Sequence, residues 1–448
     1  MKKRTKNLLC VFLIVLGLGL LGTAGWLWYD NNVDRSGWIE ENGIYSYADF
    51  HGKKITGWLT LEDKIYHFDD QYQMSTGWQQ LEIGRCYFGT DGVLRLGFTQ
   101  IDGETYYFQP TTGGLCTGWQ TIDGKTYYFS KDGPMVTDWQ ELDGNRYYFL
   151  TDGSMATDWL TLDTGVYYLG DDGVLRTGKQ QMEDGLRLFR QDGTMVTGWE
   201  EEEDGRHYYD DQGLMRTGWT EVEDKRYFLS EDGVMQTGWH EEGEYRYYLR
   251  EDGSAAVGRL ELDGDVYYFS PKGIHVILVN KDNPIPKYYQ TDVVVVEDYH
   301  RIQRVALEPL QQMLADCRAT GITCTFNSSY RTTKEQVTIL ETRTQEYEDT
   351  GMTHEEAYNK ALETVALPGT SEHQLGLSCD LVGKEANEWL AEHCWEYGFI
   401  LRYPEGKWEI TGIINEPWHF RYVGREVSMD MKDTGLCLEE YLGAGPVN

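Results

Sequence analysis

Basic residues are scarce in this chain of 448 residues. It contains 40 Lys and Arg against 74 Asp and Glu, which gives a formal net charge of −34 at pH 7. An exterior this acidic repels a phosphate backbone, which argues against nucleic acid as a partner. The same charge is compatible with a cationic ligand, and it is equally compatible with simple solubility outside the cell.

Cysteine is also scarce, with eight residues in the whole chain. No two of them have the CxxC spacing that a thiolate zinc site requires. A chain that faces outward permits disulfides. Five cysteines lie in the last third, and this odd number leaves at least one of them without a partner in that region.

Long uncharged apolar segments are represented by one run, Leu8–Trp28, which follows the basic residues Lys2, Lys3, Arg4 and Lys6. A helix of about 20 apolar residues is long enough to cross a bilayer, and its basic flank stays in the cytoplasm. No convincing small-x-small cleavage site follows the run. We therefore expect residues 1–29 to form a retained transmembrane anchor, with the bulk of the chain outside the cell.

A twenty-residue repeat fills the middle of the chain, residues 30–274. One register position is occupied in turn by Trp38, Trp58, Trp78, Phe98, Trp119, Trp139, Trp159, Lys179, Trp199, Trp219, Trp239 and Arg259. After each comes an aromatic run such as Tyr127–Phe129, then an Asp-Gly turn such as Asp132–Gly133. Short aromatic runs around Asp-Gly predict tight β-hairpins. Units too small to bury their own apolar face predict a stacked solenoid of about twelve repeats.

This pattern resembles the choline-binding and glucan-binding repeats of Gram-positive surface proteins, and the form TGWxxxDGxxYYFxxDGxMxTGW is seen from Thr117 to Trp139. The resemblance implies aromatic cages for choline-bearing teichoic acid or for polysaccharide, because a quaternary ammonium group gains cation–π energy over aromatic faces. The candidate ligand-binding residues are Trp58, Trp78, Trp119, Trp139, Trp159, Trp199, Trp219, Trp239, Tyr107, Tyr128 and Tyr148. The alternative is that the aromatics form only the solenoid core. Under either interpretation, the repeats are a spacer.

Composition changes at residue 275, and residues 275–448 show strand-like and helix-like patterns that predict a compact α+β domain. We expect a strand from Val276, a helix over Tyr299–Ala319, a strand from Ile322 and helical character over Thr333–Ala366.

Two motifs in this domain predict a metallopeptidase site. SEHQLGLSCD supplies His373 and Asp380, and INEPWHF supplies Glu416 and His419. Two histidines and one carboxylate can hold Zn²⁺ and leave a position open for water. Glu416 can take the proton of that water. Glu372, next to the predicted ligand His373, is expected to be a solvated side chain.

Several segments of this domain resemble the VanY-type D-alanyl-D-alanine carboxypeptidases. They are LVNKDNPIP at Leu278–Pro286, SSYRT at Ser328–Thr332, PGTSEHQLGLSCDL at Pro368–Leu381 and EPWHFRYVG at Glu416–Gly424. The resemblance implies that His373, Asp380 and His419 are the zinc ligands and that Glu416 is the general base.

The same resemblance implies that Arg331 pairs with the terminal carboxylate of the peptide and that Ser371 positions its backbone, with Gln336 a further substrate contact. Together these features predict a zinc carboxypeptidase that removes the C-terminal D-alanine from peptidoglycan stem peptides. It would be a single-pass membrane protein associated with the cell wall. Three alternatives stay open: an endopeptidase of the same fold, an L,D-carboxypeptidase acting on tetrapeptides, and a non-catalytic wall-binding surface protein.

Overall fold

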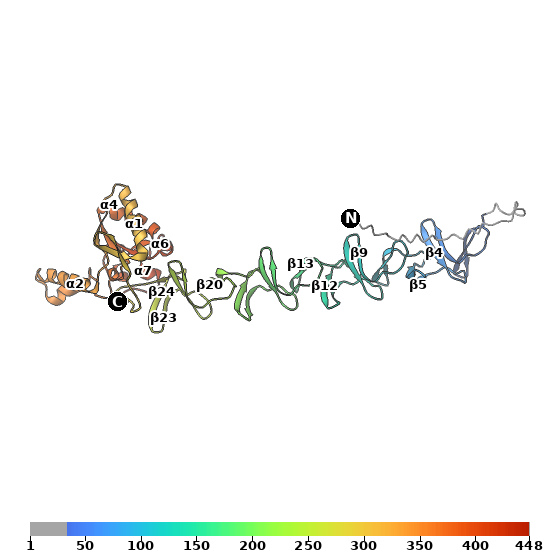
Figure 1. Ribbon diagram of the computed structural model, residues 1–448, viewed down its shortest axis with the longest axis horizontal. Helices are drawn as coiled ribbons and strands as arrows, with labels where there is room; N and C mark the ends of the chain where they lie inside the picture. Colours follow the sequence, from blue (N-terminus) through green and yellow to red (C-terminus); the bar gives the residue numbers. More distant parts are fainter. Residues whose placement is uncertain (1–33, 448) are drawn as a thin grey trace, which may run out of the picture. The chain divides into compact units, whose positions relative to one another are not determined.

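The computed structural model describes residues 34–447, and the chain divides after Val196 into two compact units. The first unit consists of antiparallel two-stranded hairpins (Figure 1). Its strands are β1 (Gly37–Glu41), β2 (Ile44–Ala48), β3 (Gly57–Leu61), β4 (Lys64–Phe68), β5 (Gly77–Leu81), β6 (Gly84–Phe88), β7 (Gly97–Ile101), β8 (Glu104–Phe108), β9 (Gly118–Ile122), β10 (Lys125–Phe129), β11 (Asp138–Leu142), β12 (Asn145–Phe149), β13 (Asp158–Leu162), β14 (Gly165–Leu169), β15 (Gly178–Met182) and β16 (Gly185–Phe189).

In the β9–β10 and β11–β12 hairpins, the tight turn is formed by the first of two Asp-Gly pairs in the repeat. In the β9–β10 hairpin, Ile122 pairs with Lys125, and the two residues between them, Asp123 and Gly124, have φ angles of 51° and 80°. Two successive positive φ values are those of a type I′ turn, which matches the twist of the flanking strands. The second pair, Asp132–Gly133, lies in the connection to the next hairpin instead.

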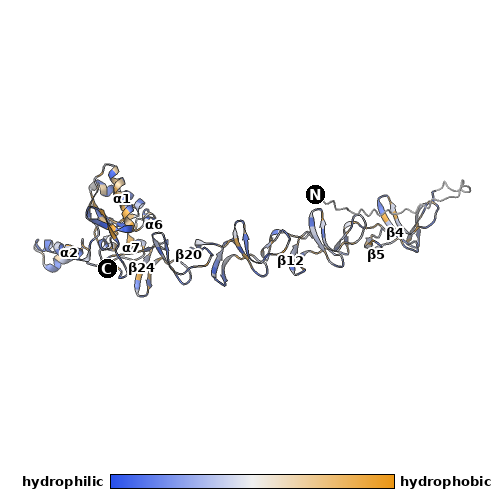
Figure 2. Cartoon of the chain, in the orientation of Figure 1, coloured by the Kyte–Doolittle hydropathy of each residue, from blue (hydrophilic) through white to orange (hydrophobic). Residues whose placement is uncertain are grey.

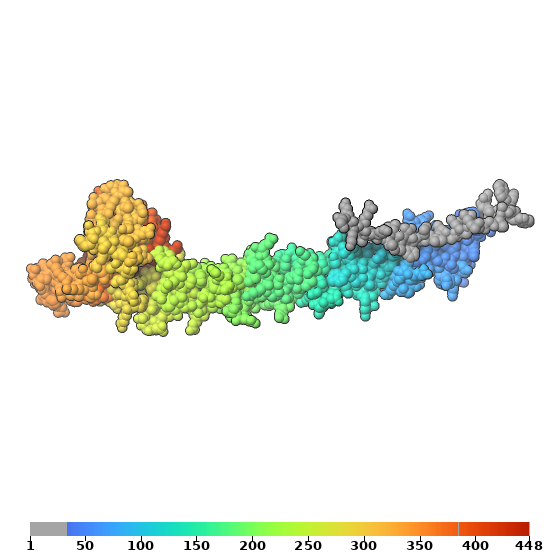
Figure 3. Space-filling model, in the orientation of Figure 1, coloured from blue at the N-terminus to red at the C-terminus, as the bar shows by residue number. Residues whose placement is uncertain are grey.

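Consecutive hairpins stack on one another through these connections. The backbone N–H of Leu115 donates to the carbonyl of Arg85, and that of Met135 donates to the carbonyl of Thr105, each in a preceding hairpin. Rings that end several of the aromatic runs, such as Phe108 and Phe129, are completely buried. Figure 3 shows neighbouring hairpins in direct contact along each unit. The predicted β-hairpin repeat array is therefore confirmed.

The second unit begins with hairpins of the same kind and continues into the C-terminal domain. Its hairpin strands are β17 (Gly198–Glu202), β18 (Gly205–Tyr209), β19 (Gly218–Val222), β20 (Lys225–Leu229), β21 (Gly238–Glu242), β22 (Tyr245–Leu249), β23 (Gly258–Leu262) and β24 (Asp265–Phe269). The C-terminal elements are β25 (His275–Val276), β26 (Val293–Glu297), β27 (His300–Gln303), α1 (Arg304–Ala319), β28 (Thr325–Ser328), α2 (Thr333–Glu348), α3 (His354–Ala361), the 3₁₀ helix η1 (Glu372–Leu375), β29 (Ser378–Val382), α4 (Lys384–His393), the 3₁₀ helix η2 (Cys394–Tyr397), β30 (Phe399–Leu401), α5 (Trp408–Thr411), β31 (His419–Tyr422), α6 (Arg425–Met431) and α7 (Leu438–Tyr441).

An antiparallel sheet in the order β28-β29-β31-β30 forms the centre of this domain. Helix α1 packs its apolar side, including Leu310 and Met313, against sheet residues such as Leu381 and Phe420. In Figure 2 strongly hydrophobic residues gather around α1, whereas the hairpins are mostly hydrophilic or intermediate. The predicted α+β class is confirmed. The predicted helix over Tyr299–Ala319 is too long at its start, because β27 occupies the first part of that segment.

The last hairpins share a hydrophobic core with the C-terminal domain. Tyr247 and Tyr268 from the hairpins lie in one buried cluster with Ile400, Val427 and Leu438. Polar contacts reinforce this core, since the Tyr422 hydroxyl donates to Glu244 at 2.6 Å. The junction between repeats and domain is thus a packed interface within the second unit.

The prediction of a single-pass membrane protein is wrong on the evidence of the described residues. Among residues 34–447 no helix is long and apolar enough to cross a membrane. The longest helices there, α1 and α2, have 16 residues each, whereas a span needs about 20 apolar residues. The predicted anchor Leu8–Trp28 lies outside the described residues. The seven cysteines within them are all free and buried.

Candidate active site

The register of the central sheet places two of the predicted metal ligands side by side. Asp380 on β29 pairs directly with His419, the first residue of β31. His373 lies on η1, just before β29. The ligand atoms of these three buried residues all lie within 4.8 Å of one another. Strand pairing therefore brings together three residues that are spread over 47 positions of the sequence.

Local backbone geometry orients His373 toward the cluster. Its Nδ1 lies 2.9 Å from the carbonyl oxygen of Ser329. A carbonyl can only accept, so Nδ1 carries the proton and Nε2 keeps its lone pair for a metal. Gly376 then reverses the chain with a φ of 73°. A Cβ at this position would lie 2.7 Å from Val293, so the turn requires glycine on both grounds.

Glu416 lies beside this cluster, in the loop before β31. One of its carboxylate oxygens is 3.6 Å from Nδ1 of His419. Burial raises the pKa of the Glu416 carboxyl to about 7, although His419 and Arg331 counteract part of that effect. A carboxyl group that changes protonation near neutral pH can both accept and return a proton.

Arg331 faces the same pocket from the loop before α2. Its guanidinium Nη2 is 3.3 Å from Asp380, and its Nε donates to Ser328 at 2.9 Å. Its side chain is 19% exposed. A small polar pocket is lined by Arg331, Ser371, His373, Asp380, Glu416 and His419 together with Glu372, Tyr403 and nearby apolar residues. Six of the residues predicted from the sequence thus line one pocket.

Gln336 does not line this pocket. It is completely buried, and its side-chain oxygen accepts a hydrogen bond from Arg331 at 3.3 Å, while its amide donates to the carbonyl of Ala366. The structure therefore places Gln336 behind Arg331, where it holds the guanidinium.

Glu372 is not the solvated side chain that we expected from the sequence. Its carboxylate is fully buried and accepts hydrogen bonds from Arg402 at 2.7 Å and Arg421 at 2.8 Å. Burial alone would raise the pKa of Glu372, but the two guanidinium groups lower it strongly. The other carboxylate oxygen lies 3.6 Å from Nε2 of His419, so this charge is also a neighbour of a predicted metal ligand.

The pairing of Arg402 extends this buried network to the C-terminal helix. Both terminal nitrogens of Arg402 donate to Glu439 on α7, and Glu439 also accepts from Asn280. The sequence did not indicate this arrangement, because Glu372, Arg402 and Glu439 are far apart along the chain. Arg402 directly follows β30 and Arg421 lies on β31, so their proximity becomes apparent only when the pairing of these two strands is known.

The donor set fits a divalent metal ion. Oδ1 of the buried Asp380 lies 3.0 Å from Nδ1 of His419 and has no other hydrogen-bond partner among the described residues. Burial lowers the pKa of His419, but hydrogen bonds to Asp380 and Glu372 outweigh it and raise that pKa to about 9. The pocket thus favours positive charge at its centre. Two imidazoles and a carboxylate are the ligands of a catalytic zinc site.

The predicted repeat aromatics occupy equivalent places in their hairpins. Tyr128 lies directly across from Trp119, and Tyr148 across from Trp139. Most of these tryptophans also contact a tyrosine of the next hairpin: Trp119 and Tyr147 have ring centroids 5.0 Å apart, at an interplanar angle of 68°. Trp58 and Trp159 contact Phe88 and Phe189 of the next hairpin instead. Trp58, Trp78, Trp159, Trp199, Trp219 and Trp239 repeat the position on their own hairpins, and Tyr107 lies across from Phe98.

Comparison with known families gives matches for both parts of the chain. Residues 299–425 match the VanY family, described as D-alanyl-D-alanine carboxypeptidase. Residues 116–141 and 136–179 match a choline-binding repeat, and residues 237–255 match a putative cell wall binding repeat. Both resemblances drawn from the sequence motifs are confirmed.

Individual relatives agree with these matches. A D-alanyl-D-alanine carboxypeptidase of Enterococcus faecalis is 45% identical over 175 residues, which cover 37% of this chain and 65% of that protein. A bifunctional D-Ala-D-Ala dipeptidase and D-Ala-D-Ala carboxypeptidase of Enterococcus gallinarum is 38% identical over 183 residues, covering 37% of this chain and 91% of that protein. A solved VanY D,D-pentapeptidase from a VanB-type vancomycin resistance cassette, in complex with Zn(II), is 44% identical with a TM-score of 0.36, over 37% of this chain and 97% of that chain.

Proposed function

The chain belongs to the VanY family of D-alanyl-D-alanine carboxypeptidases, and from this premise we propose that it removes the C-terminal D-alanine from peptidoglycan stem peptides in a zinc-dependent reaction. The observation that carries the proposal is one buried pocket that combines His373, Asp380 and His419 with Glu416 and Arg331. Residues 275–448 would form the catalytic domain, and residues 30–274 the wall-binding part.

The metal would be held by Nε2 of His373, the carboxylate of Asp380 and Nδ1 of His419. When bound, zinc polarises the scissile carbonyl and lowers the pKa of a bound water to about 7. The protein contributes the orientation of its ligands. Ser329 fixes His373 through its carbonyl, and the sheet register fixes Asp380 against His419.

Glu416 would act as general base and then as general acid. It accepts the proton of the attacking water and returns it to the amine of the departing D-alanine. Its carboxylate lies close enough to His419 Nδ1, at 3.6 Å, to reach the water side of the cluster. General acid–base catalysis of this kind contributes roughly 10²- to 10⁴-fold to a rate.

Arg331 would bind the terminal carboxylate of the peptide. A guanidinium matches a carboxylate with two parallel hydrogen bonds, and contacts with Ser328 and Gln336 hold Arg331 in the pocket. Ser371, which lines the same pocket, would position the peptide backbone. A recognised free carboxylate favours an exopeptidase over an endopeptidase, because an internal bond has no carboxylate next to it.

The repeats would attach the enzyme to the cell wall through a wall polymer, either choline-bearing teichoic acid or a polysaccharide. The matches to choline-binding and cell-wall-binding repeats support this role. Attachment raises the effective concentration of stem peptides around the pocket. We propose a cell-wall-associated location.

Digestion of defined muropeptides by the full chain with added Zn²⁺ tests the proposal. Mass spectrometry should show loss of one D-alanine from pentapeptide stems, and neither a chelated sample nor Glu416→Gln should release it. Cleavage confined to cross-linked dimers would identify an endopeptidase. Cleavage confined to tetrapeptides would identify an L,D-carboxypeptidase, and no cleavage of any substrate would leave a wall-binding protein.

A further inference from the structure

Glu372 is a buried charge that the proposed catalytic steps do not use. It is the first residue of η1, and its side chain has no exposed surface. Oε1 of its carboxylate accepts hydrogen bonds from Arg402 and Arg421. Apolar side chains of similar volume often replace a buried ion pair without loss of stability. The charge of Glu372 therefore points to a role beyond packing.

The second oxygen of this carboxylate faces a predicted metal ligand. Oε2 accepts a hydrogen bond from the hydroxyl of Ser378 at 3.1 Å, and it lies 3.6 Å from Nε2 of His419. Ser378 is on β29, two residues before Asp380. The strand that supplies one metal ligand thus also orients the oxygen that faces another.

The side of the ring that faces the metal decides which nitrogen of His419 carries the proton. Nδ1 lies 3.0 Å from Asp380, where the ligand atoms of the cluster converge. A neutral imidazole that offers Nδ1 to a metal carries its proton on Nε2. Nε2 is buried and has no hydrogen-bond partner within residues 34–447. A buried N–H without an acceptor is costly, and Oε2 of Glu372 lies beside it.

His373 shows the same arrangement in completed form. Its Nδ1 lies 2.9 Å from the carbonyl oxygen of Ser329, which leaves Nε2 for the metal. A histidine ligand usually donates its second N–H to a carbonyl or a carboxylate, which fixes the ring and makes the ligating nitrogen more basic. A carboxylate is the stronger acceptor, because a charged partner roughly doubles the strength of a hydrogen bond. The acceptor available to His419 is of this stronger kind.

The two arginines hold Glu372 from three parts of the domain. Arg402 also donates to Glu439 on α7. Arg421 donates to the carbonyl of Ile277, in the segment after β25, at 2.8 Å. Arg421 itself lies on β31, two residues after His419. The carboxylate therefore has a fixed position relative to the imidazole that it faces.

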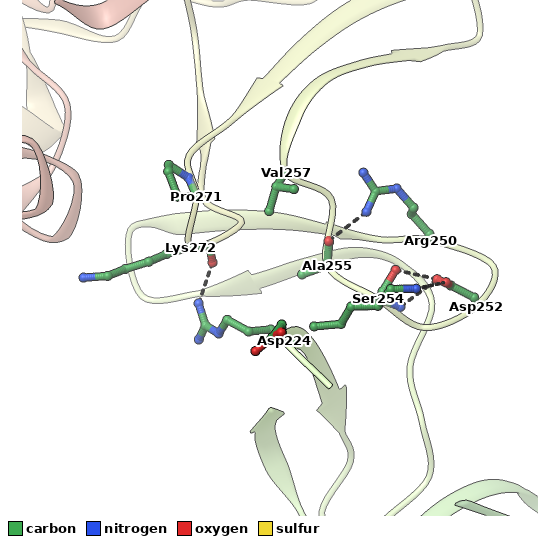
Figure 4. A pocket seen from close by; sticks show the side chains of 10 residues that line it. Asp224, Arg250, Asp252, Ser254, Ala255, Val257, Pro271 and Lys272 are labelled. Carbon is green, nitrogen blue, oxygen red and sulfur yellow. Dashed lines mark hydrogen bonds and ion pairs between the residues drawn. The ribbon is translucent and has the colours of Figure 1, made fainter. Parts of the chain in front are cut away.

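The repeats hold their arginines differently. Among residues 34–447, six repeat tryptophans have the guanidinium carbon of an arginine 3.7–5.2 Å from the ring centre. One of these arginines, Arg226 over Trp219, donates to the carbonyl of Lys272. In the cavity shown in Figure 4, Arg250 donates to the carbonyl of Ala255 at 2.9 Å. Neutral carbonyl groups are sufficient there, whereas beside His419 two guanidinium groups converge on one carboxylate.

We propose that Glu372 is a positioning residue for His419, and that its Oε2 accepts the Nε2–H of the imidazole when a divalent metal ion is bound. The inference rests on the proposed zinc-dependent function and deepens it by naming a residue that sets metal affinity. A shift of less than about 1 Å brings the two atoms to the roughly 2.7–2.9 Å of a charge-assisted hydrogen bond. The ring is then held with Nδ1 toward the metal.

Zinc affinity of the full chain, measured without peptide by competition with a chromophoric chelator, tests this role. Glu372→Gln should bind Zn²⁺ about 10- to 100-fold more weakly. The amide of glutamine keeps its oxygen toward the two arginines, so its NH₂ group meets the Nε2–H of His419 and donor faces donor.

Glu439→Gln is the matched control. It also removes a buried carboxylate from Arg402, but Glu439 does not line the pocket of the metal ligands. Both variants should unfold at a lower temperature, and only Glu372→Gln should lose zinc affinity. Unchanged affinity in Glu372→Gln, or an equal loss in both variants, would overturn the assignment.

A crystal structure of the zinc-loaded native chain gives a readout that does not depend on the folding of a variant. The separation between Nε2 of His419 and Oε2 of Glu372 should shorten from 3.6 Å to roughly 2.7–2.9 Å. An unchanged separation, or another acceptor on Nε2, would overturn the proposal.

The same measurements separate this inference from the proposed function. If the native chain needs Zn²⁺ to release D-alanine and Glu372→Gln binds Zn²⁺ as tightly as the native chain, only the role of Glu372 is lost. If the native chain releases D-alanine equally well after chelation, the zinc-dependent function itself is overturned.

Discussion

Removal of the Arg331 guanidinium should abolish the preference for a free terminal carboxylate. We expect Arg331→Ala to lower kcat/KM for D-alanine release from a pentapeptide by about 10- to 100-fold. Hydrogen bonds to charged groups contribute about 1.5–3 kcal/mol, and each 1.4 kcal/mol corresponds to a factor of about ten. The lower part of this range reflects partial screening by solvent, since the Arg331 side chain is 19% exposed.

The decisive measurement compares the acid with a C-terminal amide of the same peptide. The unmodified enzyme should prefer the acid by about 10- to 100-fold, and Arg331→Ala should hydrolyse both at similar low rates. Arg304→Ala is the matched control, because Arg304 is exposed and pairs with Asp292 away from the pocket. If Arg331→Ala still discriminated fully between acid and amide, the assignment of Arg331 to the terminal carboxylate would be refuted.

Glu439→Ala should lower the free energy of unfolding by about 3–5 kcal/mol, since it leaves the buried Arg402 without one of its partners. Urea titration measures this free energy, and a loss below about 1 kcal/mol would contradict the prediction. His275 is kept neutral in the folded chain, because burial lowers its pKa from 6.5 to about 4. The unfolded chain therefore binds this proton first as the pH falls, so stability decreases from about pH 6.5 down to pH 4. His275→Asn should abolish about 2 kcal/mol of that decrease between pH 7 and pH 4.5, and identical pH profiles of unfolding for both proteins would refute the reasoning. Glu416→Gln should reduce kcat by about 10²- to 10⁴-fold, with no loss of thermal stability and with Zn²⁺ still bound. Chelation should inactivate the native enzyme, and added Zn²⁺ should restore its activity. Near-normal turnover by Glu416→Gln would exclude Glu416 as the general base.

The repeat array was predictable because its information is local. A fixed twenty-residue period, paired aromatics and Asp-Gly turns each point to hairpins without reference to distant residues. The role of each Asp-Gly pair was less clear from the sequence: Asp123–Gly124 closes a hairpin, while Asp132–Gly133 connects two. The two pairs have the same sequence, and only the strand register distinguishes their structural roles.

The sequence predicted the metal ligands of the candidate site, but it did not predict the residues that surround them. His373, Asp380, Glu416 and His419 occur in two motifs whose chemistry is recognisable from the residues alone. Glu372 was expected in solvent, yet it is buried, because it is neutralised by Arg402, which follows β30, and by Arg421 on β31, both far along the chain. The arginines over the tryptophans were missed for a similar reason, since a single basic residue in a strand carries no local signal of its partner.

The shared core of Tyr247, Tyr268, Val427 and Leu438 has a consequence for recombination between proteins. A gene fusion that transferred residues 275–448 alone would expose the apolar side of α6 and α7, and the recipient would need a new surface to cover them. A fusion that begins at Thr197 would carry the covering hairpins along. The segment that can be transferred between proteins without exposing this core is thus longer than the catalytic domain, because it includes the last hairpins of the repeat array.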